Sequence, residues 1–155
     1  MRKLLIAIDY SLAAEKVAML GNELGKAMNA EIVLLHVIED IQYYDSAIYN
    51  PIMGYGGFTS INFLDNDVLK SIEKEANHFL EKTKLFLGNM HIKTKVCHGS
   101  ITNTIIQYAN DEHCQLIVIG THSRNMLEEL FLGSTAQKLL KYSNVPLYII
   151  PIKNI

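Results

Sequence analysis

Short apolar segments alternate along this chain with segments whose apolar residues recur at helical spacing. The apolar segments are predicted to be buried strands, and the intervening segments are predicted to be helices. The predicted strands are residues 3–8, 31–37, 91–97, 116–119 and 145–150, and the predicted helices are residues 11–28, 67–87, 100–112 and 134–142. Strands of this kind, each joined to the next by a helix, predict an α/β fold with a five-stranded, parallel, doubly wound sheet in the order β-α-β-α-β-α-β-α-β.

A chain of 155 residues offers material for one core, because two cores would each lie near the lower limit of independent stability. Residues 1–155 are therefore expected to form a single domain. Residues 39–66 interrupt the pattern, since they show no sustained period and are rich in Tyr and Gly. A connection of this length is typical of a functional lid or interface loop, with a poorly ordered insertion as the alternative.

Composition narrows the class of protein. The formal net charge is −2, with acidic and basic residues mixed along the chain, so no basic stripe suited to nucleic acid is expected. The apolar runs are too short to span a bilayer, and the first one is too short for a secretory signal. Two cysteines do not make a disulfide framework. These features predict a cytoplasmic protein with neither a nucleic-acid nor a membrane partner.

Candidate ligand-binding residues follow the first two predicted strands. In a doubly wound sheet, ligands bind at the carboxyl ends of the strands, where the strand order reverses. Asp9 follows the first strand and can accept hydrogen bonds from ribose hydroxyls or help to hold a metal; a capping role at the next helix is the alternative. Val37 ends the second strand and offers an apolar side chain and main-chain groups for an adenine edge. His36, within the apolar run, is expected to be a satisfied core residue.

The end of the fourth predicted strand carries the strongest signal. Gly120 follows that strand directly and lets the backbone approach a ligand without a Cβ. Gly133, Ser134 and Thr135 begin the last predicted helix, where free N–H groups and the helix dipole attract phosphate oxygens. The alternative is a turn at Gly133 followed by a helix cap at Ser134.

This spacing resembles the Gly-x2-Gly-x9-Gly-(Ser/Thr) ATP-binding motif of the universal stress protein family, with Ser123 in place of the second glycine. The resemblance extends over nearly the whole chain. It includes Ala-x-Asp-x-Ser at 7–11, Leu-His-Val at 35–37, Gly99, Leu-Ile-Val-Ile-Gly-Thr-His at 116–122 and Asn-Val-Pro-Leu-Tyr-Ile-Ile at 144–150. It implies the Rossmann-like fold of the adenine nucleotide alpha hydrolase-like proteins, binding of ATP, ADP or AMP with or without Mg²⁺, and a homodimer formed through residues 146–150.

The resemblance also implies the residues of the nucleotide site. Asp9 would contact the sugar and phosphate portion, the backbone at Val37 would hold adenine, and the glycine loop and last helix would hold ribose and phosphates. The complete set is Ala7, Ile8, Asp9, Val37, Ile119, Gly120, His122, Ser123, Gly133, Ser134 and Thr135. Arg124 is either a counter-charge for phosphate or a solvated loop residue. At Ser123, a positive φ would cost about 1 kcal/mol, whereas a negative φ would leave the hydroxyl available to phosphate.

Other motifs do not fit. Residues 21–26 have one residue too few for a P-loop and lack the Ser or Thr after the lysine. The Cys-His pairs at 97–98 and 113–114 match no standard zinc spacing. No catalytic residue stands out, so the resemblance favours a nucleotide-binding regulatory module of the stress response with an unknown protein partner. A slow ATP hydrolase that uses Asp9 and a divalent cation, and a dimeric scaffold that has lost the nucleotide, remain as alternatives.

Overall fold

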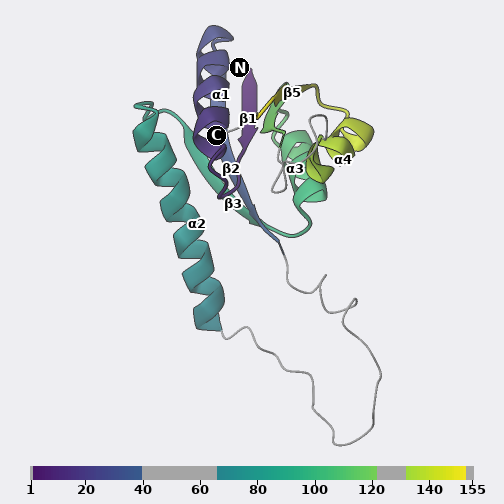
Figure 1. Ribbon diagram of the computed structural model, residues 1–155. Helices are drawn as coiled ribbons and strands as arrows, with labels where there is room; N and C mark the ends of the chain where they lie inside the picture. Colours follow the sequence, from purple (N-terminus) through teal and green to yellow (C-terminus); the bar gives the residue numbers. More distant parts are fainter. Residues whose placement is uncertain (1, 40–65, 122–131, 153–155) are drawn as a thin grey trace, which may run out of the picture.

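The computed structural model describes residues 2–39, 66–121 and 132–152, and it places a twisted sheet between two pairs of helices (Figure 1). The strands are β1 (Lys3–Ala7), β2 (Glu31–Ile38), β3 (Lys93–His98), β4 (Leu116–Gly120) and β5 (Leu147–Ile150). The helices are α1 (Ala14–Ala27), α2 (Asn66–Phe86), α3 (Ile101–Asp111) and α4 (Ser134–Tyr142). The predicted fold class and the predicted order of elements are confirmed.

The five strands are parallel and lie in the order β3-β2-β1-β4-β5. β1 is central, and its Leu5 pairs with Val33 of β2 on one side and with Ile117 of β4 on the other. The chain therefore proceeds outward from β1 to β3 and then crosses to the opposite side of β1 for β4 and β5. This reversal between β1 and β4 creates a crevice at the carboxyl edge of the sheet.

Alternation along the strands divides the core into two layers. Leu4 and Ile6 of β1 face α1 and α2, whereas Leu5 faces α3 and α4. Figure 1 shows these two helix pairs on opposite faces of the sheet. Because both faces are covered, residues 4–7 of β1 and residues 116–119 of β4 are all apolar, which explains why they read as unbroken apolar runs.

Three predicted element starts differ from the observed ones by two residues or more. α1 begins at Ala14 rather than at residue 11, because residues 11–13 form a turn in which the Ala14 N–H donates to the Ser11 carbonyl at 3.1 Å. β3 begins at Lys93, after a turn in which the N–H of His91 donates to the Asn89 side chain. β5 begins at Leu147, and Pro146 precedes it.

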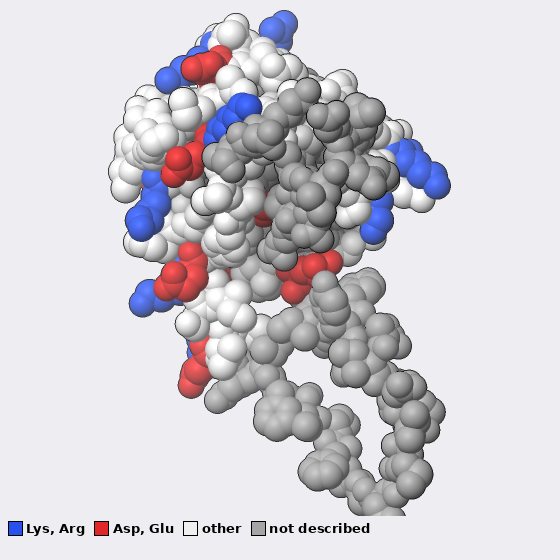
Figure 2. Space-filling model, in the orientation of Figure 1, with Lys and Arg blue, Asp and Glu red and all other residues white. Residues whose placement is uncertain are grey.

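Several sequence-based expectations lie outside the described residues. They concern residues 40–65 of the long connection, together with His122, Ser123 and Arg124. No helix in the described part of the chain is long and apolar enough to cross a membrane. On the face shown in Figure 2, acidic and basic side chains of described residues are interspersed rather than separated by sign.

Candidate functional site

A cavity of about 530 Å³ lies at the carboxyl ends of β1 and β4, where the strand order reverses. Of the eleven predicted site residues, His122 and Ser123 are not described, and the other nine all line this cavity. The nine are Ala7, Ile8, Asp9, Val37, Ile119, Gly120, Gly133, Ser134 and Thr135. Residues from four separate parts of the sequence are therefore brought together around one space.

The inner surface of the cavity is largely apolar and draws on both core layers. Val17 of α1 contributes from one side of the sheet, and Ile101 and Ile105 of α3 contribute from the other. Ile119, near the end of β4, is 4 % exposed and belongs to the same layer as Ile105. This lining suits a flat, apolar group such as a purine base, because such a group loses little hydration on entering.

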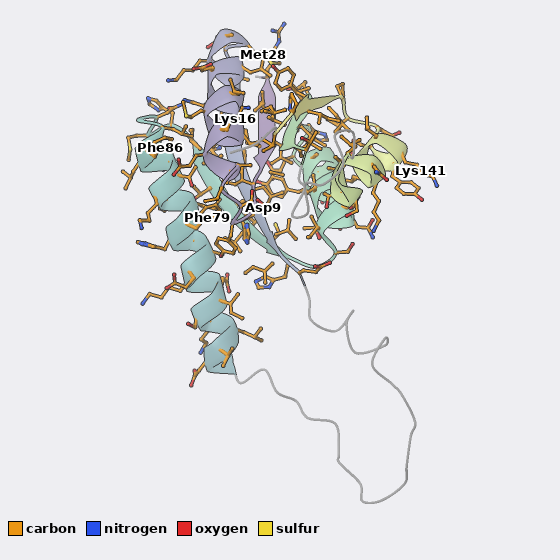
Figure 3. All side chains as sticks on the ribbon, in the orientation of Figure 1. Asp9, Lys16, Met28, Phe79, Phe86 and Lys141 are labelled. Carbon is orange, nitrogen blue, oxygen red and sulfur yellow. The ribbon has the colours of Figure 1, made fainter. Side chains whose placement is uncertain are left out.

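Asp9 lies just beyond the end of β1, at the mouth of the cavity (Figure 3). Its Oδ1 accepts a hydrogen bond from the main-chain N–H of Ser11 at 3.0 Å. The N-cap position of α1 is Ala13, without a side-chain cap, so the alternative in which Asp9 caps that helix is wrong. Asp9 instead stabilises the connection before the helix, and an exposed carboxylate is held at the cavity where it can accept from hydroxyl groups.

The end of β2 extends beyond the end of β1. Their last register pair is Ala7 with Leu35, and the N–H of Ile8 then donates to the Leu35 carbonyl at 3.0 Å. Val37 therefore lies past the β1–β2 ladder, half-buried at the cavity. His36 is buried, and its Nδ1 is hydrogen-bonded to the Ile8 carbonyl, as expected for a core residue whose polar group has a partner. His36 also lines the cavity.

The amino end of α4 provides the polar side of the cavity. Gly133 is the N-cap residue, with φ of −55° and no side-chain cap, and its carbonyl accepts from the N–H of Gln137 at 3.0 Å. Ser134 is the first helical residue, so the alternative that made it the cap is wrong. The first N–H groups of a helix have no partner within the helix, and they carry a partial positive charge. Together with the Ser134 and Thr135 hydroxyls, they suit an anionic group.

The absence of a Cβ at Gly120 matters for packing against α1 as well as for the predicted approach of a ligand. A Cβ at this position would lie 2.8 Å from Cγ2 of Val17 and 3.4 Å from Cγ1 of Ile152. The Val17 side chain of α1 therefore lies too close to the end of β4 for a Cβ at Gly120 to fit without a shift, whereas the distance to Ile152 is an ordinary van der Waals contact. The sequence alone predicted only a close approach by a ligand.

Other residues of the cavity were not predicted as site residues. Ser11, Ile101 and Ile105 carried a signal, since they lie in the quoted motif or on the apolar face of a predicted helix. Thr121 also lies in a quoted motif, at 116–122, whereas Ile152 carried no signal. The remaining additions are Ala13, Ala14, Val17, Leu35, His36, Glu39 and Ala136.

The charges around the cavity are acidic as far as the structure describes them. Asp9 and Glu39 line the cavity, whereas no Lys or Arg does so among the described residues. Within the same residues, no three His, Cys, Asp or Glu side chains are grouped so as to hold a metal ion. Among the described residues, the positive partial charge available to an anion comes from the amino end of α4.

Similarity to known proteins agrees with this geometry. The model of the Universal stress protein family matches residues 1–151. Universal stress protein MJ0577 of Methanocaldococcus jannaschii is 29 % identical over 157 residues, which cover 99 % of this chain and 96 % of the relative. A solved structure of MJ0577 has a TM-score of 0.70 at 26 % identity and covers 99 % of this chain and 98 % of that one.

Two solved structures with nucleotides share the fold. A universal stress protein in complex with cAMP has a TM-score of 0.68 at 14 % identity, covering 96 % of both chains. A universal stress protein from Archaeoglobus fulgidus in complex with dAMP has a TM-score of 0.61 at 17 % identity, covering 99 % of this chain and 98 % of that one.

Proposed function

Since this chain belongs to the universal stress protein family, we propose that it is a regulatory module that binds an adenine nucleotide at the carboxyl edge of its sheet. The observation that carries the proposal is the convergence of the nine described motif residues on one cavity of about 530 Å³. The cAMP and dAMP complexes of two proteins with the same fold support the choice of an adenine nucleotide.

Adenine fits the apolar part of the cavity. Ile105 and Ile119 offer flat apolar contact, and the main chain of Val37 lies at the cavity beyond the β1–β2 ladder. A purine base needs both features, because its faces are apolar and its edge carries donors and acceptors. In the proposed complex, the main chain at Val37 reads that edge.

The sugar and phosphates fit the polar part. The Asp9 carboxylate, held by the Ser11 N–H, accepts from ribose hydroxyls. The amino end of α4 and the hydroxyls of Ser134 and Thr135 bind phosphate oxygens. These groups stand on two elements that both border the cavity, so one nucleotide reaches them together.

The charge of the lining bears on which nucleotide binds. Asp9 and Glu39 repel a triphosphate, and the described lining offers no Lys or Arg to offset them. We therefore propose that ATP binds with Mg²⁺, which reduces the charge of the triphosphate, and that AMP depends on Mg²⁺ much less.

Slow ATP hydrolysis is a second candidate function. Glu39 lines the same cavity as Asp9 and is a second carboxylate there, and two acids at one cavity can help to hold a divalent cation or orient water. Binding without efficient turnover is favoured, since the described lining offers no Lys or Arg side chain to stabilise the transferring phosphoryl group. Phosphate release that Glu39→Gln abolishes would favour the enzyme.

The edge strand β5 is the proposed dimer contact. It ends the strand order, and its Tyr148 is 45 % exposed. An unpaired sheet edge is normally covered or paired with a second strand. We propose that the protein acts in the cytoplasm as a homodimer through residues 146–150, together with a protein partner. A species that stays monomeric at micromolar concentration in light scattering would contradict the dimer.

Isothermal titration calorimetry tests the binding function. The nucleotide-stripped protein is titrated with ATP and with AMP, each with and without Mg²⁺. Saturable binding is expected, with ATP strengthened by Mg²⁺ more than AMP. Gly133→Val should weaken binding at least about tenfold by obstructing the α4 terminus, while its φ of −55° suits valine. Lys141→Ala, at the far end of α4, is the matched control (Figure 3). Absence of binding by the folded wild type would reject the function.

A further inference from the structure

The two residues that follow β5 continue across the end of β4. The N–H of Thr121 donates to the Ile150 carbonyl at 2.9 Å, and the N–H of Ile152 donates to the Thr121 Oγ1 at 2.8 Å. In a regular parallel ladder, the second bond would end on the main-chain oxygen of Thr121. The side-chain hydroxyl takes this role instead, so the β4–β5 pairing extends one bond past Gly120, the last residue of β4.

The same short segment is also held from α1. The ammonium group of Lys16 donates to the Pro151 carbonyl at 3.3 Å. Figure 3 shows Lys16 on α1, the helix that packs over this end of the sheet. Residues 151–152 are thus fixed from two directions, by β4 through Thr121 and by α1 through Lys16.

These contacts determine where the Ile152 side chain lies. Ile152 packs against the core layer that includes Val17, and its Cγ1 lies 3.4 Å from the position that a Cβ would take at Gly120. Ile152 is also one of the residues that line the cavity. One wall of the cavity, beside Gly120, therefore comes from a residue that follows the last strand.

We propose that Thr121 is a positioning residue of the nucleotide site, whose hydroxyl binds the Ile152 N–H and so sets the Ile152 side chain as the wall beside Gly120. This inference rests on the proposed nucleotide binding. In the bound state the nucleotide meets Ile152, and the Thr121 hydroxyl acts on affinity through that wall. Bound nucleotide in turn stabilises residues 151–152.

The test compares four variants by calorimetric titration with AMP. Thr121→Val removes the acceptor at nearly constant shape and should weaken binding about three- to tenfold, the loss expected for one hydrogen bond. Thr121→Ser keeps the hydroxyl and should bind within about twofold of the wild type. Ile152→Ala should also weaken binding, because it removes the wall. The double variant, Thr121→Val with Ile152→Ala, should bind AMP no more weakly than whichever single variant has the lower affinity, since both substitutions act through one contact.

Two outcomes would overturn the positioning role. The first is a Thr121→Val protein that binds AMP as the wild type does. The second is a double variant whose loss of AMP affinity equals the product of the two single-variant losses. That result would mean that Thr121 acts on the nucleotide independently of Ile152. Unfolding by urea verifies that each variant is folded. If Thr121→Val does not fold, the affinity of Ile152→Ala still tests the wall.

Amide hydrogen exchange separates this inference from the proposed function. In the nucleotide-free protein, the Ile152 amide should be protected, Thr121→Val should remove that protection, and Thr121→Ser should keep it. AMP should slow exchange at Ile152 further. An unprotected Ile152 amide in a wild type that does bind AMP would refute the positioning role alone. A wild type that binds neither ATP nor AMP would instead reject the nucleotide site and, with it, this role.

Discussion

The Nδ1 of His36 lies 2.9 Å from the main-chain oxygen of Ile8, just beyond the last register pair of β1 and β2. The oxygen can only accept, so Nδ1 carries the proton. The ring centroid of Tyr10 lies 4.5 Å from that of His36 and 4.8 Å from that of Phe79 on α2. The residues on both sides of Asp9 are therefore held by side chains from β2 and α2, which fixes the carboxylate at the cavity.

Replacement of His36 by leucine should destabilise the protein. The Ile8 carbonyl would lose a buried partner, at a cost of about 1–3 kcal/mol in the free energy of unfolding. His36→Asn should recover part of that loss, because its amide N–H stands close to the position of Nδ1–H. Urea unfolding measures both. Equal stability of His36→Leu and the wild type would show that the hydrogen bond contributes nothing.

Gly120→Ala should also lower the free energy of unfolding, by about 1–3 kcal/mol, because the new Cβ meets Val17. The added methyl group would stand 2.8 Å from Cγ2 of Val17, too close for unstrained contact. Val17→Ala in the same chain should relieve that contact, so the double variant should lose less stability than the sum of the two single losses. Simple additivity in urea unfolding would mean that Val17 is not what requires glycine at this position.

Local patterns predicted the fold well, whereas contacts between distant residues escaped prediction. Apolar periodicity placed α4 at its observed bounds, because that signal is contained within the helix itself. It began α1 too early, because Leu12 continues the helical spacing although it is 82 % exposed in the preceding turn. The bond from Ile152 to Thr121 joins residues 31 positions apart, so nothing in either local pattern indicated it.

The residues of the candidate site could be predicted mainly because the sequence resembles the universal stress protein family. Asp9, Val37 and the residues that begin α4 come together because the carboxyl ends of parallel strands meet at one edge. Periodicity alone left two alternatives open, in which Asp9 or Ser134 capped a helix. Only the observed helix starts decide against them, since a cap depends on where the helix begins to within one residue.

Cys114 should be the less reactive of the two thiols. Burial raises its pKa to about 11, and burial also raises the pKa of the more accessible Cys97. At pH 8 a thiol of pKa 11 is about one-thousandth thiolate, and the thiolate is the nucleophile. In a Cys97→Ser protein, Cys114 should therefore react with a disulfide reagent at least about tenfold more slowly in the folded state than in the state unfolded by urea. Equal rates folded and unfolded would contradict its burial.

The Lys3–Glu112 ion pair should make stability depend on pH in the acidic range. A hydrogen bond from Lys3 Nζ lowers the pKa of the Glu112 carboxyl below its ordinary value. A lowered carboxyl pKa stabilises the fold above the ordinary pKa, and this contribution is lost as the pH falls through the folded-state pKa. Between pH 6 and pH 3, urea midpoints should thus fall more for the wild type than for Glu112→Gln.

A matched control for this prediction is Glu23→Gln on α1. Glu23 is exposed and makes no ion pair with any residue in the described ranges. Its variant should follow the pH dependence of the wild type. If Glu112→Gln and Glu23→Gln behave alike, the pair with Lys3 does not contribute to stability.

A ¹H–¹⁵N NMR titration with AMP tests the location of nucleotide binding most directly. The account predicts saturable shifts of the amides of Ile8, Asp9, Val37, Gly120 and Ser134, with little change elsewhere. A second, more open cavity between α3 and α4, lined by Asn103, Gln107 and Tyr142 among others, provides an internal comparison. Shifts concentrated at that second cavity, or no shifts at millimolar AMP, would contradict a nucleotide site at the carboxyl edge of the sheet.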